Sequence, residues 1–155
     1  MEWVSITTAD VRDRLSDAEY TAVETKGLDV AQPDPWTGLI ADAVAAARGS
    51  IAGNPHNVLG VAGTVPPSAV RHVLAWIVWD GLTRFRLSRY TTPEREKGYD
   101  AANRFFDNVA GGKIGVEKPD VETSDVVPNR VGGTVAVDAE LSTKRRVTRG
   151  RMDGL

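Results

Sequence analysis

The sequence predicts a mainly α-helical protein, a small helical bundle around one long central helix, followed by an extended C-terminal tail. Before residue 112, apolar residues recur at helical spacing in several segments separated by capping residues, prolines and glycines. After residue 112, the chain is rich in valine, glycine and charge and contains no convincing helix. The 155 residues, 41% of them apolar, suit one domain plus an appendage. We therefore expect a helical body over residues 1–112 and an arm for subunit or partner contacts over residues 113–155.

Two short helices are expected first. Thr7 or Thr8 can cap a helix over residues 9–15. Ser16 and Glu19 have capping-box spacing, in which each side chain bonds to the backbone amide of the other residue. They begin a second helix, which Gly27 is expected to end.

A third helix is expected from Pro35 to about residue 51. Asp34 is a suitable N-cap, and Pro35 fits the first turn, where its missing amide costs no hydrogen bond. One face is apolar and consists of Trp36, Ile40, Ala43, Val44, Ala47 and Ile51. Gly53-Asn54-Pro55 stops this helix, and a polar, glycine-rich loop follows to residue 66.

The central helix is expected over residues 69–90, after Pro66-Pro67-Ser68. At ~1.5 Å per residue it would be roughly 33 Å long. Its middle is apolar nearly all round, which is typical of a helix contacted on several sides. The apolar residues are Val70, Val73, Leu74, Trp76, Ile77, Val78, Trp79, Leu82 and Phe85.

The last helix begins at Thr91 and Glu94, which have capping-box spacing, with Pro93 in the first turn. Gly111-Gly112 supplies a left-handed C-cap. Its apolar face consists of Tyr99, Ala102, Phe105, Phe106 and Val109. From this helix and the central one, the expected core residues are Val70, Leu74, Trp76, Ile77, Val78, Phe85, Tyr99 and Phe106.

The C-terminal arm is distinguished by its charge. Residues 141–155 carry five Lys and Arg and one Asp, a net charge of +4, whereas the rest carries 14 basic and 20 acidic residues, a net charge of −6. A basic tail on an acidic body suggests docking on an acidic surface, such as a neighbouring copy; a solvated, flexible terminus is the alternative. Residues 129–137 would form a hairpin about Gly132-Gly133 or one strand added to a partner. The expected partner- or subunit-binding residues are Lys144, Arg145, Arg146, Arg149, Arg151 and Leu155.

The sequence offers no arrangement typical of catalysis or of cofactor binding. The absence of cysteine removes disulfides, thiolate metal sites and cysteine nucleophiles. His72 and Asp80 would be roughly 12 Å apart along one helix, too far for a catalytic dyad, and no histidine or carboxylate cluster has metal-ligand spacing. The loop over residues 60–64 lacks the lysine of a phosphate-binding loop. We therefore expect no enzyme activity, no cofactor and no metal site.

Arg84, Arg86, Arg89 and Arg95 crowd one corner of the predicted bundle. They could contact phosphate groups, but neighbouring acidic residues and the acidic body favour ion pairs within or between subunits. A small helical nucleic-acid-binding protein that uses its basic tail is the alternative function. Trp3 is a core candidate like the other three tryptophans, but because it precedes the first helix, packing on a neighbouring subunit is the alternative. The sequence has no signal peptide and no apolar run near the ~20 residues of a membrane span, so we expect a soluble, cytoplasmic protein.

A series of short segments occurs in a characteristic order along nearly the whole chain. The segments are Ile6-Thr7-Thr8-Ala9-Asp10-Val11, the alanine-rich residues 40–47 with Ser50-Ile51, Val65-Pro66-Pro67, the Arg/Tyr-rich residues 84–90, Tyr99-Asp100-Ala101-Ala102, residues 109–114 and residues 148–155. The series resembles the head-tail connector proteins (adaptor or head-completion proteins) of tailed bacteriophages, especially those of Mu-like phages and prophages. Residues 53–59 depart from the family's Gly-Arg-Tyr-x-x-Pro-Leu segment, so a contact made by that arginine or tyrosine has no counterpart here.

The resemblance implies a structural virion protein at the neck, where head and tail meet. It implies a ring, usually dodecameric, that docks on the portal protein after DNA packaging and extends the DNA channel. The ring then offers a surface to the stopper or tail-completion protein. DNA would pass through without sequence-specific binding, which suits an acidic channel lining. No cofactor and no membrane contact are implied.

Overall fold

The computed structural model of the chain describes residues 1–120. In this part, five α-helices, one short 3-10 helix (η1) and two short strands follow one another. Their order is β1 (Val4–Ser5), α1 (Thr8–Arg12), α2 (Asp17–Asp29), α3 (Pro35–Gly53), β2 (Thr64–Val65), α4 (Pro67–Arg84), η1 (Ser88–Tyr90) and α5 (Pro93–Ala110). The predicted mainly helical class is confirmed. The hairpin or added strand expected over residues 129–137 lies outside the described residues.

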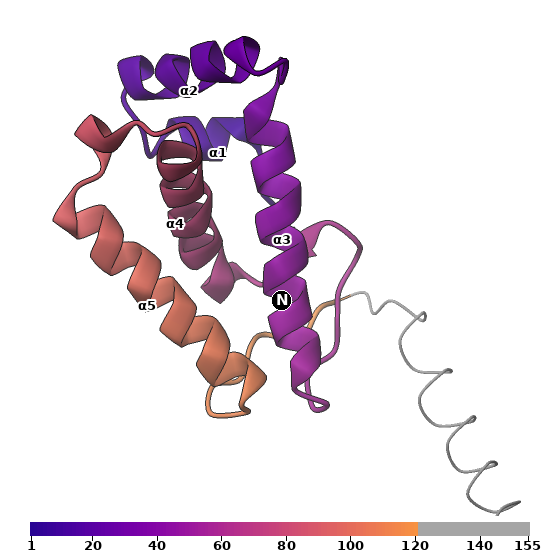
Figure 1. The fold of residues 1–155 in the computed structure, drawn as a ribbon. Helices are drawn as coiled ribbons and strands as arrows, with labels where there is room; N and C mark the ends of the chain where they lie inside the picture. The colour runs from indigo at the N-terminus through magenta and orange to yellow at the C-terminus, as the bar shows by residue number, and fades with distance from the viewer. Residues whose placement is uncertain (121–155) are drawn as a thin grey trace, which may run out of the picture. The chain divides into compact units, whose positions relative to one another are not determined.

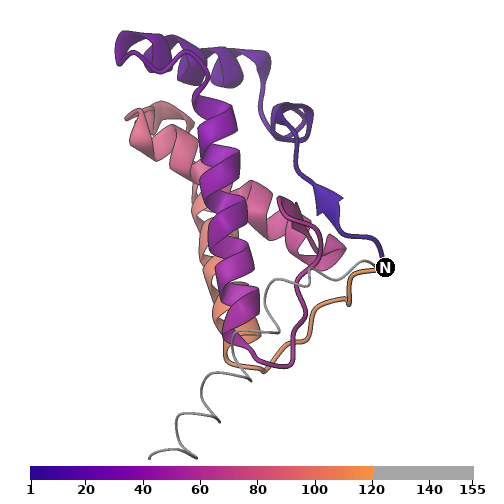
Figure 2. The same cartoon turned by 90° about the vertical axis from the view of Figure 1, so that its right-hand side faces the viewer.

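Helices α3, α4 and α5 form the bundle (Figure 1). Helix α4 packs against both α3 and α5, and α3 also packs against α5. Helices α1 and α2 lie at one end of the bundle, where α2 runs crosswise to α3 (Figures 1 and 2). Since α4 also contacts α1 and η1, it is the central helix that its nearly all-round apolar sequence predicts.

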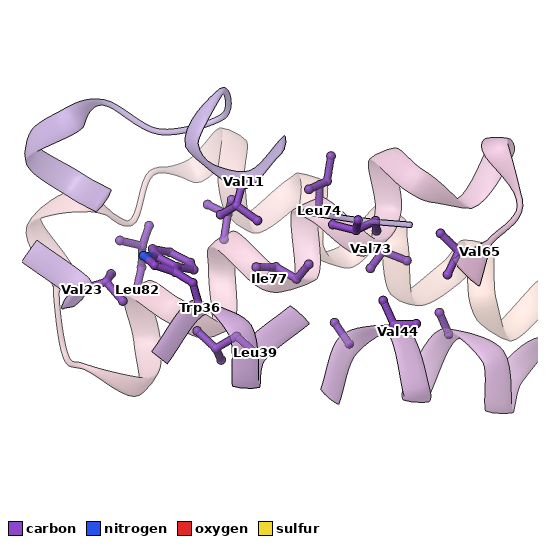
Figure 3. Close-up of a cluster of buried hydrophobic side chains, with 14 of the residues drawn as sticks. Val11, Val23, Trp36, Leu39, Val44, Val65, Val73, Leu74, Ile77 and Leu82 are labelled. Atoms are coloured by element: carbon purple, nitrogen blue, oxygen red, sulfur yellow. The ribbon is translucent and has the colours of Figure 1, made fainter. Parts of the chain in front are cut away.

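The main core fills the space between these helices (Figure 3). Trp36 of α3 is fully buried and stacks on Tyr20 of α2 with ring centroids 5.2 Å apart. Of the predicted core residues, Leu74, Ile77, Val78 and Phe106 are buried, and Val70, Trp76 and Phe85 are partly buried against the same cluster. Tyr99 is half-buried and stacks on Trp79 with ring centroids 5.7 Å apart.

The helix starts largely follow the predicted caps. Thr7 with Asp10 and Ser16 with Glu19 form capping boxes at α1 and α2, and Asp34 caps α3. Helix α1 stops at residue 12 instead of 15, because residues 13–15 turn the chain so that Ser16 can cap α2. Side-chain caps are local features, so they can be predicted from short sequence spacings.

The predicted cap of α5 is wrong by one residue. Thr92, not Thr91, accepts the hydrogen bond from the Arg95 amide, at 3.4 Å. Pro93 is the first helical residue, so the residue directly before it takes the N-cap position. Arg95 rather than Glu94 then stands three residues after the cap, and no capping box forms.

The predicted ends of α2 and α4 are also wrong. Helix α2 continues past Gly27 to residue 29, and α4 stops at residue 84 instead of 90. Ala31, with φ of 58°, and Arg86, with φ of 55°, follow these helices in the left-handed conformation. Both ends are Schellman motifs: the Gln32 amide donates to the Gly27 carbonyl at 2.7 Å, and the Leu87 amide donates to the Leu82 carbonyl at 2.9 Å.

The ribbon formed by β1 and β2 was not predicted. Trp3, directly before β1, is only 6% exposed and donates from Nε1 to the Glu117 carbonyl at 2.9 Å. It therefore packs inside its own chain, so of the two alternatives that the sequence leaves open for Trp3, the core position holds and the contact with a neighbour does not. Together with the hydrogen bond from the Met1 amino group to the Lys118 carbonyl, this contact places residues 113–120 against the N-terminal segment of the body.

Candidate functional site

The four arginines of the predicted corner do not form one cluster. Arg95 makes a two-point ion pair with Glu19 of α2, with Nη1–Oε1 at 2.7 Å and Nη2–Oε2 at 3.0 Å. Arg95 Nη1 also donates to the Tyr90 carbonyl at 2.6 Å. Because the Glu19 and Arg95 side chains are only 13% and 23% exposed, the pair is shielded from water and ties α2 to the start of α5.

The pKa of the Glu19 carboxyl is lowered in the folded protein. The hydrogen bond from Arg95 keeps the pKa of the Glu19 carboxyl below its ordinary value, and the bond from the Ser16 amide at 2.8 Å acts in the same direction. Both outweigh the cost of partial burial, which alone would raise this pKa. The same carboxylate thus completes the capping box of α2 and binds α5.

The other three arginines are exposed and form no ion pair within residues 1–120. Arg89 lies over the Tyr90 ring, with its guanidinium carbon 4.6 Å from the ring centroid. Burial raises the pKa of the Asp80 carboxyl, and the nearby charge of Arg84 opposes that shift. Arg84, Arg86 and Arg89 are therefore the cations of this corner that can pair with another molecule.

His72 is a packed histidine. Its ring stacks on Phe105 with centroids 4.2 Å apart, and its Nε2 accepts a hydrogen bond from Arg71 Nε at 3.2 Å. Burial, and then the charge of Arg71, lower the pKa of His72. Within residues 1–120, no group of three or more His, Asp or Glu side chains is placed to hold a metal ion.

A groove of about 790 Å³ runs beside the N-terminal strand. We call it the N-terminal groove; it is lined by residues 1–5, Val61, Thr64, Pro119 and Asp120. Its lining thus joins three segments that are far apart in sequence: the chain start, the loop before α4 and the end of the described chain.

Arg48 of α3 fixes the loop that forms part of this groove. Its guanidinium donates to the carbonyls of Gly60 at 2.9 Å, Val61 at 2.9 Å and Thr64 at 2.7 Å. It also lies over the Trp3 ring, 5.7 Å from the centroid. Sequence reasoning missed Arg48; the available signal was a single arginine directly after the alanine run of α3.

The expected binding residues of the tail, Lys144, Arg145, Arg146, Arg149, Arg151 and Leu155, lie outside the described residues. Among residues 1–120, no helix is both long enough and apolar enough to span a bilayer. Comparison of the chain with known protein families, with curated proteins and with solved structures finds no match.

Proposed function

We propose that this chain is a structural subunit of a head-tail connector ring in a tailed phage or prophage. The ring docks on the portal protein, extends the DNA channel and offers a surface to the stopper or tail-completion protein. In this role the chain is not an enzyme and acts only by binding copies of itself and its neighbours at the virion neck.

The order of the sequence segments that resemble connector proteins carries this proposal. Several of these segments stand at the points that define the body. Thr7 and Asp10 form the capping box of α1, Val65-Pro66-Pro67 leads from β2 into α4, and Gly111-Gly112 ends α5. Segments that fix where helices start and end also fix the shape of the body. A subunit of a ring needs a fixed shape, because it must fit against identical copies.

The distribution of charge also supports a subunit that surrounds DNA without holding it. Residues 1–120 carry 16 Asp and Glu and 13 Lys and Arg. An acidic lining repels the phosphate backbone, so DNA can slide through a channel. The basic residues 144–151 are then available for acidic surfaces of neighbouring subunits. In a ring many such contacts act together, so each can be weak.

Removal of residues 141–155 tests this proposal against the nucleic-acid-binding alternative. For a connector, the truncated chain loses ring assembly, as seen by its mass in solution and by electron microscopy. For a nucleic-acid-binding protein, it instead loses DNA binding that weakens steeply with added salt. A full-length variant with Lys144, Arg145 and Arg146 replaced by alanine separates loss of charge from loss of chain length. An unchanged assembly state together with lost DNA binding would overturn the connector proposal.

A further inference from the structure

The N-terminal groove has an open strand edge. β1 pairs with β2, with Val4 opposite Val65 and Ser5 opposite Thr64, and the sheet has no third strand in the part of the chain that the structure describes. In an antiparallel pair, successive residues point their backbone groups toward the partner strand and then away from it. One of Val4 and Ser5 therefore directs its N–H and C=O at the free edge of β1.

The opposite side of the ribbon is already covered. β2 is buried at both of its residues, and the Thr64 carbonyl accepts a hydrogen bond from Arg48. β1, in contrast, is exposed at both residues. An unpaired, exposed strand edge is a ready template for one further strand.

The same groove collects exposed apolar side chains. Five large apolar side chains are exposed among residues 1–120, and three of them, Met1, Val4 and Val61, line this groove, with exposures of 67%, 44% and 50%. The other two, Leu28 and Val30, lie at the end of α2. Apolar side chains gathered beside a free strand edge are typical of a surface that another segment covers.

The segment that fits this surface belongs to the chain itself. Residues 129–137 contain the β-branched Val131, Thr134, Val135 and Val137, which favour extended pairing. Arg130 of the same segment is complementary to Glu2, a groove residue without an ion pair among the described residues. Eight residues, 121–128, separate Asp120 from this segment, and at about 3.3 Å per residue they let it begin up to roughly 30 Å away, about the diameter of a small domain and enough to reach an adjoining subunit.

We propose that the N-terminal groove receives the C-terminal arm of a second copy, whose residues 129–137 add as a strand to the free edge of β1. This inference rests on the proposed ring, because a ring closes through head-to-tail contacts in which each copy offers one surface and receives with another. The arm is the offered segment and the groove is the receiving surface.

Disulfide trapping tests this exchange directly, because the chain has no cysteine of its own. One full-length copy carries Ser5→Cys, and a second, larger tagged copy carries Val131→Cys, Val135→Cys or Val137→Cys in turn. After co-expression and oxidation, we expect a covalent pair with one chain of each size for at least one of the three positions. Directly opposed strand residues have Cβ atoms about 4.5–5.5 Å apart, near the range that a disulfide bridges. Ser88→Cys, an exposed serine outside the groove, is the matched control.

Two results would overturn the inference. The first is a yield of mixed pairs no higher than with Ser88→Cys. The second is a bridge that forms only inside one chain when both cysteines are present, which would show that each groove binds its own arm. Rings that assemble without the bridge overturn the groove assignment but leave the connector proposal intact. If instead the bridge forms but the virion neck assembles without this protein, the groove assignment holds and the connector proposal is overturned.

Substitution of the groove without cysteine gives a second measurement. Val4→Asp places a charge where the arm would pack, and we expect self-association to weaken by about tenfold or more. Val30→Asp is the control, because Val30 is also an exposed valine, at 58% against 44% for Val4, but lies outside the groove. Equal effects of the two substitutions on the association constant would contradict the proposed docking surface.

Discussion

Three helices end in Schellman motifs, but only α5 places a glycine at the left-handed position, Gly112 with φ of 74°. Ala31 and Arg86 occupy this position after α2 and α4. A side chain other than glycine costs about 1–2 kcal/mol in this conformation. At two helix ends, therefore, a residue adopts a backbone conformation that its own side chain disfavours, and tertiary packing compensates for that cost.

Arg86→Gly should stabilise the protein. Glycine removes the cost of holding a side chain in the left-handed conformation, but it also loses more conformational entropy on folding. The first effect is the larger, so we expect the free energy of unfolding to rise by about 0.5–1 kcal/mol. Gly112→Ala, the reverse change at the end of α5, should lower it by about 1 kcal/mol. Urea unfolding of the two variants measures both effects. A destabilised Arg86→Gly protein would show that the Arg86 side chain contributes more than its backbone costs.

Gly81 of α4 is required for the position of Trp36. A Cβ atom at residue 81 would lie 2.9 Å from two atoms of the Trp36 ring, whereas a Cβ at Gly49 of α3 meets nothing within 4 Å. Gly81→Ala should therefore destabilise the protein by about 1–3 kcal/mol through overpacking. Gly49→Ala should stabilise it by up to about 1 kcal/mol, since alanine is the better helix former. Thermal unfolding of both variants checks the contrast, and equal effects would contradict it.

The burial of His72 predicts a pH dependence. Its pKa in the folded state is lowered, so below about pH 6.5 the unfolded chain binds a proton that the folded chain resists. Stability should consequently fall as the pH drops from about 6.5 toward the folded-state pKa of His72. His72→Gln should flatten this part of the unfolding profile. A profile unchanged by His72→Gln would refute the assignment.

At the scale of elements, the Glu19–Arg95 pair determines how α2 is attached. Arg95→Leu leaves a shielded carboxylate without its partner and should cost about 1.5–3 kcal/mol. Because the pKa of Glu19 is lowered in the folded protein, the contribution is present above about pH 4.3, the ordinary pKa of a glutamate, and is lost as the pH falls through the folded-state value. A double-mutant cycle with Glu19→Gln, measured by urea unfolding at pH 7 and pH 3, isolates the pair. Equal coupling energies at the two pH values would contradict the conclusion that the pair depends on the negative charge of Glu19.

The elements also show what sequence can predict. Caps such as Ser16 with Glu19 follow from residues three apart, so they were located correctly. The ends of α2 and α4 were not, because Gly27 resembles a stop signal and Arg86 does not. The two-residue strands depend on pairing between residues about 60 positions apart in the chain, for which no local signal exists.

The candidate sites follow the same distinction. The cluster of arginines at one corner was visible in the sequence, but the partner of Arg95 lies 76 residues away and depends on the packing of α2 against the bundle. Arg48 was missed because its partners are backbone carbonyls, which any sequence provides. The sequence leaves Trp3 open between the core and a neighbour, because nothing nearby in sequence indicates that the Glu117 carbonyl lies within hydrogen-bond distance of its ring.

At the scale of the whole molecule, we propose that an acidic helical body is joined to copies of itself by its basic arm. Body and arm play different parts. In the proposed ring, the body forms the wall and, in the N-terminal groove, the receiving surface. In the same proposal, the arm makes the contact that extends from one copy to the next.

The most direct test of the central claim is electron microscopy of a lysate from a phage that carries an early stop codon in this gene. The account predicts separate heads and complete tails, with the heads empty or leaking DNA, because the ring that joins them is missing. Expression of the intact chain from a plasmid should restore joined particles, and this controls for effects on neighbouring genes. Normal infectious particles from the stop-codon phage would contradict the claim that the chain forms the connector.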